Sequence, residues 1–205
     1  MAAAAQMWVD SNMAYWKDLP EIVLNKKARD SNYFKNLAQN SKSQENYYRA
    51  ITGYAEKDYA PLLNLINWQR HRVILDVGGG KGNFLQKVLN VQIHLKGFLM
   101  DLSSVIQSLG TVPPNLQRRL SLIAHDFFNP WPVKTDAIML FRILHDWSDE
   151  ESDLILRQAY NALQSNGKIY IVERVLEENS PNGSLLDLNM MVVTTVMPPE
   201  NWTKV

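Results

Sequence analysis

The sequence has no cysteine, no net charge and no long apolar run, and each absence excludes a class of protein. Without cysteine, disulfide bonds, thiolate catalysis and cysteine-based metal sites are ruled out. Lys and Arg together number 21, as do Asp and Glu, so no basic surface predicts binding to nucleic acid or to a membrane. No apolar segment approaches the roughly 18 residues of a membrane span, and the N-terminal Met-Ala-Ala-Ala-Ala lacks the basic start of a signal peptide. We therefore expect a cytoplasmic globular protein.

Glycine is scarce along the chain but concentrated in one place. Four of the nine glycines lie within residues 78–82, directly after the apolar segment Val73–Val77. The apolar segment is typical of a buried strand, and the residues after the glycines have the apolar spacing of a helix. Glycines at such a turn let a ligand approach the peptide groups closely. Strand, glycine turn and helix together predict the first unit of a nucleotide-binding α/β fold.

The spacing of these glycines narrows the choice of ligand. Gly78-x-Gly80-x-Gly82 is not the dinucleotide fingerprint G-x-G-x-x-G, because position 83 is Asn, and Lys81 lacks the following Ser or Thr of a phosphate-binding P-loop. Asp76, just before the turn, would repel a pyrophosphate but could face the ammonium group of an amino acid. The sequence therefore favours S-adenosylmethionine over a nicotinamide cofactor.

The order of predicted elements divides the chain in two. Residues 1–70 show helical spacing without a strand signal, and we expect a helical lid there. Residues 71–205 alternate strands and helices, which predicts a parallel sheet with right-handed crossovers. The expected strands lie near 73–77, 97–101, 120–125, 135–141 and 168–175. The expected helices lie near 82–90, 103–109 and 149–163, with Asn166-Gly167 ending the last one.

Acidic residues follow two of the predicted strands. In an open parallel sheet, ligands bind where the strands end. Asp101 comes about 20 residues after the glycine turn, the place of a carboxylate that accepts ribose hydroxyls. Asp126 ends the third strand and could accept the adenine amino group, while Phe127 packs against the ring. A helix cap or turn role remains open for each acid taken alone.

The fourth strand leads to Arg142 and His145, and the fifth contains Glu173. Imidazole titrates near neutral pH, so His145 could take a proton from a substrate hydroxyl. Glu173 interrupts an apolar strand, a costly placement unless the carboxylate is paired. We expect Glu173 to orient His145, although pairing with Arg142 or Arg174 is the alternative. The other histidines, His71, His94 and His125, are given no role.

Six motifs follow one another along the chain: Leu75-Asp-Val-Gly-Gly-Gly-Lys-Gly, Met100-Asp-Leu, His125-Asp-Phe-Phe, Leu144-His-Asp-Trp-Ser-Asp-Glu-Glu, Val172-Glu-Arg-Val-Leu and Leu186-Asp-Leu-Asn-Met-Met. In this order they resemble the small-molecule O-methyltransferase family, which includes plant caffeate and flavonoid, acetylserotonin and bacterial polyketide enzymes. The resemblance implies a Rossmann-like class I methyltransferase fold, His145 as general base with Glu173 behind it, and no metal. It implies S-adenosylmethionine bound by Asp76, Gly78, Gly79, Gly80, Asp101, Leu102, Asp126, Phe127 and Arg142. Met190 and Met191 would line the acceptor pocket.

The resemblance also has departures. We expect this chain to lack the family's N-terminal winged helix and its last two strands, with Glu200 as the candidate remnant of a second acidic motif. The fifth strand would then be a long apolar edge, which proteins avoid exposing. We expect the 184–197 segment, a second copy or a partner chain to cover it. The predicted function is O-methylation of a small hydroxylated natural product; the alternative is a non-catalytic subunit or fragment that acts only with a complementing partner.

Overall fold

The computed structural model describes residues 2–25, 33–173 and 188–194 of the 205-residue chain. These residues form two compact units, which interleave in sequence. The first unit takes its described residues from the ranges 1–50, 142–150 and 173–205, and the second from 51–141 and 151–172. No helix among the described residues is long and apolar enough to cross a membrane. The predicted boundary at residue 70, between a helical lid and the α/β region, stays a prediction.

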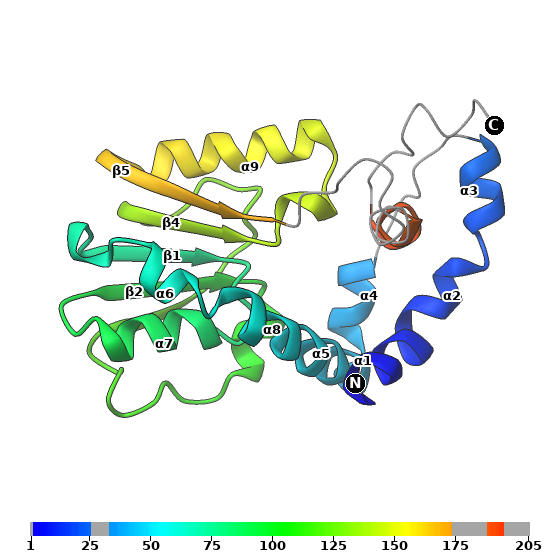
Figure 1. Ribbon diagram of the computed structural model, residues 1–205. Helices are drawn as coiled ribbons and strands as arrows, with labels where there is room; N and C mark the ends of the chain where they lie inside the picture. The colour runs from blue at the N-terminus through cyan, green and yellow to red at the C-terminus, as the bar shows by residue number, and fades with distance from the viewer. Residues whose placement is uncertain (1, 26–32, 174–187, 195–205) are drawn as a thin grey trace. The chain divides into compact units, whose positions relative to one another are not determined.

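The second unit contains a five-stranded parallel sheet of order β3-β2-β1-β4-β5 (Figure 1). The strands are β1 (Val73–Val77), β2 (Lys96–Asp101), β3 (Leu120–Ala124), β4 (Thr135–Phe141) and β5 (Leu163–Val172). The helices between them are α7 (Asn83–Val91), α8 (Ser103–Ser108) and α9 (Asp149–Ala162), with the short turn η3 (Leu144–Asp146) after β4. The predicted parallel α/β sheet, with five strands along the chain, is confirmed.

The apolar core follows from the strand and helix patterns. β1 is buried over residues 74–77, and α7 turns Leu85, Val88 and Leu89, all with no exposed surface, toward the sheet. The α7 and α9 crossovers step in opposite directions along the strand order, so right-handed connections place them on opposite faces. Both faces of the sheet are therefore covered, and the central strands read as nearly continuous apolar runs.

The N-terminal region is helical where it is described. Its elements are α1 (Ala2–Met7), the π-type turn η1 (Trp8–Asn12), α2 (Met13–Trp16), α3 (Leu19–Asn25), α4 (Tyr33–Gln39), α5 (Ser41–Tyr59), α6 (Leu62–Leu65) and the 3₁₀ turn η2 (Trp68–Arg70). Pro61 separates α5 from α6, because proline lacks the N–H that a continuing helix needs. Residues 188–193 form one further helical segment in the first unit.

The fifth strand corrects one prediction. Asn166-Gly167 does not end the helix: α9 already ends at Ala162, and both residues lie inside β5. There β5 bulges, so that the pair Thr135–Leu163 is followed by Ala137–Lys168, and Asn166 adopts a φ of 63°. The left-handed tendency of Asn-Gly is thus used in a strand bulge. β5 is an edge of the described sheet, as predicted. What covers it stays a prediction, since half of 184–197 and all of 195–205, including Glu200, lie outside the described residues.

Candidate active site

The predicted site residues fall into both units. The glycine loop, Asp76, Asp101, Leu102, Asp126 and Phe127 belong to the second unit, whereas Arg142, His145, Glu173, Met190 and Met191 belong to the first. Each group is described within its own unit.

The glycine loop follows β1 and uses a backbone that other residues rarely adopt. Gly78, Gly80 and Gly82 have φ values of 62°, 58° and 66°. Gly79 needs to be glycine for another reason, because a Cβ atom there would lie 2.5 Å from Cγ of Asp76. The Gly82 N–H donates to the carbonyl oxygen of Gly79 at 2.9 Å, which closes the turn before α7 begins. The left-handed turns and the close approach of Asp76 therefore explain why glycine occupies these positions.

Two buried carboxyl groups lie beside this loop. Asp101, at the end of β2, accepts the Gly80 N–H at 2.8 Å with Oδ2 and the Leu102 N–H at 2.7 Å with Oδ1. Burial raises the pKa of Asp101, and these two hydrogen bonds oppose the rise. Burial, followed by repulsion from Asp101, raises the pKa of Asp76 to about 7. The loop thus has an anionic side that would gain from a cationic or hydroxyl-bearing ligand.

The donor set fits an adenosyl amino acid better than a phosphate. Asp101 already uses one lone pair on each oxygen for the protein, and the remaining pairs suit two vicinal hydroxyl groups. At the end of β3, Asp126 is exposed and caps the following turn by accepting the Phe128 N–H at 3.0 Å. Phe127 is half-buried next to it and meets Phe128 edge-on. The predicted roles of Asp126 and Phe127 toward adenine stay predictions.

In the first unit, the structure brings Glu173 and His145 together. Oε1 of Glu173 accepts the N–H groups of Ile143 at 2.9 Å and Leu144 at 3.0 Å. Oε2 accepts from Nδ1 of His145 at 2.6 Å. Because this contact holds a proton on Nδ1, the neutral imidazole presents an unprotonated Nε2. That is the tautomer a general base requires.

The charge around His145 favours proton uptake. Burial lowers its pKa, but the Glu173 hydrogen bond and the carboxylates of Asp146 and Glu173 outweigh burial and Arg142, so the pKa of His145 is raised above 6.5. Nε2 lies 3.4 Å from Oδ1 of Asp146, and the imidazole keeps a quarter of its surface exposed. Burial raises the pKa of Asp146 to about 6, with His145 opposing the shift. Sequence reasoning overlooked Asp146, although its position directly after His145 was a usable signal.

Arg142 has a strained backbone next to this pair. Its φ of 57° is unusual for a long side chain, and such outliers concentrate at functional sites. The strain turns the chain sharply after β4 and brings Ile143 and Leu144 to their bonds with Glu173. The predicted contact of Arg142 with a cofactor stays a prediction.

Aromatic and apolar side chains fill the first unit around η3. Trp147 stacks on Phe34 with ring centroids 6.1 Å apart, and Tyr33 meets Phe34 edge-on. Met191 is fully buried in the same unit's apolar cluster, and Met190 packs against that cluster. The aromatic side chains of this group are of the kind on which another aromatic ring could stack. The sequence did not single out Phe34, because an aromatic residue on a helix more often packs in a core, or Trp147, which follows η3.

Among the described residues, no group of three or more His, Asp or Glu side chains is arranged to hold a metal ion.

A family model described as an O-methyltransferase domain matches residues 12–201. The chain belongs to this family. Phenazine O-methyltransferase PhzM from Lysobacter antibioticus is 30% identical over 80% of this chain and 49% of its own length. Aclacinomycin 10-hydroxylase RdmB from Streptomyces purpurascens is 33% identical over 61% of this chain and 35% of its own. The chain thus spans about half or less of the length of these relatives.

A solved structure shares the fold. The O-methyltransferase NcsB1 from neocarzinostatin biosynthesis, in complex with S-adenosylmethionine and 2-hydroxy-5-methyl naphthoic acid, superposes with a TM-score of 0.83. The two chains are 23% identical, and the match covers 96% of this chain and 63% of the other. The Rossmann-like methyltransferase fold expected from the motifs is therefore confirmed.

Proposed function

We propose that this chain is the catalytic part of an S-adenosylmethionine-dependent O-methyltransferase acting on a small hydroxylated natural product. Family membership leaves the reaction open, since one relative is named a hydroxylase. The observation that carries the proposal is the His145–Glu173 pair, which holds a partly exposed imidazole in the tautomer of a base. Transfer of a methyl group to a hydroxyl oxygen requires that oxygen to lose its proton, and this imidazole could accept it.

The proposed roles follow from the chain's own groups. Gly78, Gly79, Gly80, Asp101 and Leu102 would hold the cofactor's amino acid and ribose parts, with Asp76 close by. When bound, S-adenosylmethionine supplies an electrophilic methyl group. Nε2 of His145 removes the proton from the acceptor hydroxyl, and Glu173 stabilises the imidazolium that forms. Most of the rate would come from alignment of the two reactants, and proton transfer would add roughly 10²–10⁴-fold.

The acceptor is proposed to be a flat aromatic alcohol or phenol. The half-buried Phe34, Trp147 and Met190 provide apolar surfaces in the unit that contains His145, while Met191 is fully buried in the same unit. The helical region 1–70 is proposed to act as the lid over this acceptor. The protein named phenazine O-methyltransferase and the naphthoic acid complex support the choice of hydroxyphenazines and hydroxynaphthoic acids as first probes.

Two measurements test the function. Calorimetry with S-adenosylhomocysteine should show micromolar binding to the purified chain. Mass spectrometry should then detect a gain of one methyl group on a hydroxynaphthoic acid or hydroxyphenazine incubated with S-adenosylmethionine. Binding without transfer to any probe, in a chain whose His145 is intact, would favour a subunit that needs a complementing partner. A folded chain that does not bind would contradict the proposal.

Cofactor binding should depend on pH in a defined direction. The pKa of Asp76 is raised to about 7, so this group is largely protonated at pH 6 and ionised at pH 8. If it faces the ammonium group, affinity for S-adenosylhomocysteine should rise with pH through 7 and fall again once the ligand's amino group deprotonates, at about 8. Asp76→Asn should flatten the rising part of this profile. An unchanged profile in Asp76→Asn would remove Asp76 from the ammonium site.

A further inference from the structure

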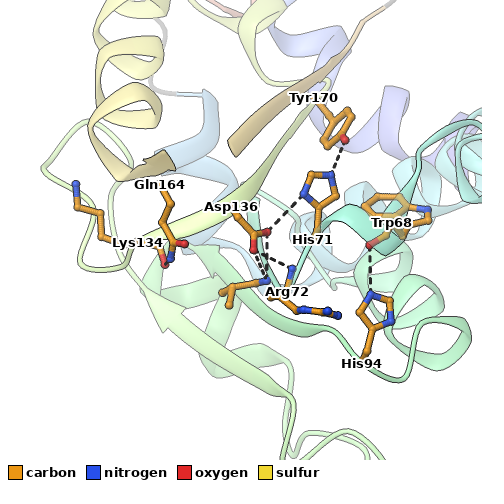
Figure 2. Close-up of polar contacts among 9 residues, drawn as sticks. Trp68, His71, Arg72, His94, Lys134, Asp136, Gln164 and Tyr170 are labelled. Atoms are coloured by element: carbon orange, nitrogen blue, oxygen red, sulfur yellow. Dashed lines mark hydrogen bonds and ion pairs between the residues drawn. The ribbon is translucent and has the colours of Figure 1, made fainter. Parts of the chain in front are cut away.

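A second chain of hydrogen-bonding groups lies in the second unit, at the start of the strands. Figure 2 shows His71, just before β1, between Asp136 of β4 and Tyr170 of β5. Nδ1 of His71 lies 3.5 Å from Oδ1 of Asp136, and Nε2 lies 2.6 Å from the hydroxyl oxygen of Tyr170. The cofactor loop follows the carboxyl end of β1, so this cluster occupies the opposite end of the sheet. Nothing in the proposed reaction uses it.

The protonation states of this cluster are fixed by its surroundings. His71 is 3% exposed, and burial lowers its pKa despite the nearby Asp136. Burial raises the pKa of Tyr170, so the phenol keeps its proton. The neutral imidazole therefore donates from Nδ1 toward Asp136 and accepts from the Tyr170 hydroxyl at Nε2. Tyr170 is thereby attached to the residue that leads into β1.

β5 needs such an attachment because its register is interrupted. Between the pairs Thr135–Leu163 and Ala137–Lys168, two residue steps along β4 correspond to five along β5. Gly167 closes this bulge tightly, since a Cβ atom there would lie 3.0 Å from the carbonyl oxygen of Asp136. Among the described strands, β5 has β4 as its one neighbour. An edge strand after a bulge has few constraints on its register.

Tyr170 supplies the missing constraint on residues 168–172. Its ring packs 6.1 Å from that of the buried Trp68, and its hydroxyl reaches His71 (Figure 2). Trp68 is in turn held by the bond of its indole N–H to the Leu63 carbonyl at 3.1 Å. A slip of β5 by one residue would turn Tyr170 away from both partners and displace the following residues by about 3.3 Å.

Glu173 is the residue that follows β5. Its carboxylate makes three contacts, with the N–H groups of Ile143 and Leu144 and with Nδ1 of His145. Glu173 directly follows Val172, the last residue of β5, so a shift of β5 along β4 would displace its backbone. We propose that the His71–Tyr170 hydrogen bond fixes the register of β5 and so positions Glu173 for its contact with His145. The proposal rests on the proposed function for its effect on turnover, but not for the contact itself.

The contact can be tested without any acceptor. The chain has four histidines, so ¹⁵N spectra of the full chain, assigned with His145→Ala, report the pKa of His145 directly. Tyr170→Phe removes the hydroxyl and keeps the ring. His71→Asn keeps a donor near the Nδ1 position but removes the acceptor at Nε2. In both variants the pKa of His145 should fall by roughly half a unit or more, because a fraction of molecules loses the Glu173 contact.

Two matched variants should leave the pKa of His145 unchanged. His71→Gln retains an acceptor within reach of Tyr170, and Tyr160→Phe removes the hydroxyl of a tyrosine that is 75% exposed on α9. A lowered melting temperature in Tyr170→Phe and His71→Asn, with the pKa of His145 unmoved, would make the cluster merely structural and overturn the proposal. If Tyr170→Phe does not fold, the comparison of His71→Asn with His71→Gln decides alone.

The same experiment separates this inference from the proposed function. A lowered pKa of His145 in His71→Asn, in a chain that methylates none of the probes, would support the positioning role and count against the methyltransferase. With an active chain, kcat should fall several-fold in His71→Asn. The KM for S-adenosylmethionine should stay unchanged, because the glycine loop lies at the opposite end of the sheet from His71. Equal loss of kcat and cofactor affinity would contradict a specific role for β5.

Discussion

The two units each contain a histidine paired with a carboxylate, and the two pairs favour opposite protonation states of the imidazole. In the first unit, His145 and Glu173 are 2.6 Å apart, and the imidazole is partly exposed. In the second, His71 and Asp136 are 3.5 Å apart, and the histidine is buried. The pKa of His145 is raised and that of His71 is lowered. Residue type alone therefore says little about which histidine takes up a proton.

The difference comes from how each carboxylate uses its oxygens. Glu173 gives Oε1 to two backbone N–H groups and keeps Oε2 for His145. Both oxygens of Asp136 accept from the backbone N–H of Val73 at 3.3 Å, and Oδ2 also accepts from Arg72 at 2.8 Å. Both oxygens of Asp136 are shared with peptide N–H groups, and its contact with Nδ1 of His71 is longer, so burial dominates at His71.

The distal ring nitrogens differ as well. Nε2 of His71 accepts from Tyr170, a donor that would oppose a second proton on the ring. Nε2 of His145 faces Oδ1 of Asp146 at 3.4 Å, an acceptor that favours an added proton. The first arrangement stabilises neutral imidazole, and the second prepares imidazole for proton uptake. The comparison predicts that matched variants at the two pairs will change different properties.

The largest difference is expected when each histidine is replaced. His145→Ala should reduce methyl transfer by roughly 10²–10⁴-fold, since it removes the base, and should leave S-adenosylhomocysteine binding unchanged. His71→Asn should reduce turnover far less and should mainly lower the free energy of unfolding. Kinetics and calorimetry on both variants give the contrast. Equal losses of turnover and cofactor binding in His145→Ala would make His145 a structural residue.

A smaller difference is expected when each carboxylate becomes an amide. In Glu173→Gln the amide oxygen can keep the two backbone bonds while its NH₂ group faces Nδ1 of His145. The proton then moves to Nε2, the wrong tautomer for a base, and we expect a loss of roughly 10²-fold in kcat. Asp136→Asn leaves that tautomer untouched and should lower unfolding free energy by about 1–3 kcal/mol. A fully active Glu173→Gln would refute the tautomer argument.

Much of the fold could be predicted from sequence because its signals are local. β1 and β4 have the predicted limits, and the glycine spacing marked the loop where the left-handed φ values occur. The boundary between α9 and β5 could not be predicted. Asn166-Gly167 favours a left-handed backbone in either a helix end or a bulge, and the choice depends on the pairing of β5 with β4, which is a long-range property.

The candidate site also has features that could be predicted from the sequence and features that could not. Asp101 and Glu173 could be chosen because an acid at the end of an apolar strand needs a partner. Arg142 was also chosen and Asp146 directly follows His145, but the left-handed backbone of Arg142 and the 3.4 Å distance from Asp146 to Nε2 of His145 could not be predicted. His71 was set aside as one histidine among several, and its place between Asp136 and Tyr170 emerges only when β1, β4 and β5 are assembled.

The smallest expected effect is the opposite pH dependence of stability at the two histidines. The folded pKa of His145 lies above its unfolded value of about 6.5, so its contribution is complete below pH 6.5 and is lost as pH rises through the folded pKa. The folded pKa of His71 lies below about 6.5, so its contribution is present above that pH and is lost as pH falls through the folded pKa. Thermal unfolding between about pH 5 and 8 should therefore show the deficit of His71→Asn, relative to the unmodified chain, growing with pH. The deficit of His145→Ala should shrink over the same range, and a parallel trend in both variants would mean that the two pairs do not differ in their preferred charge.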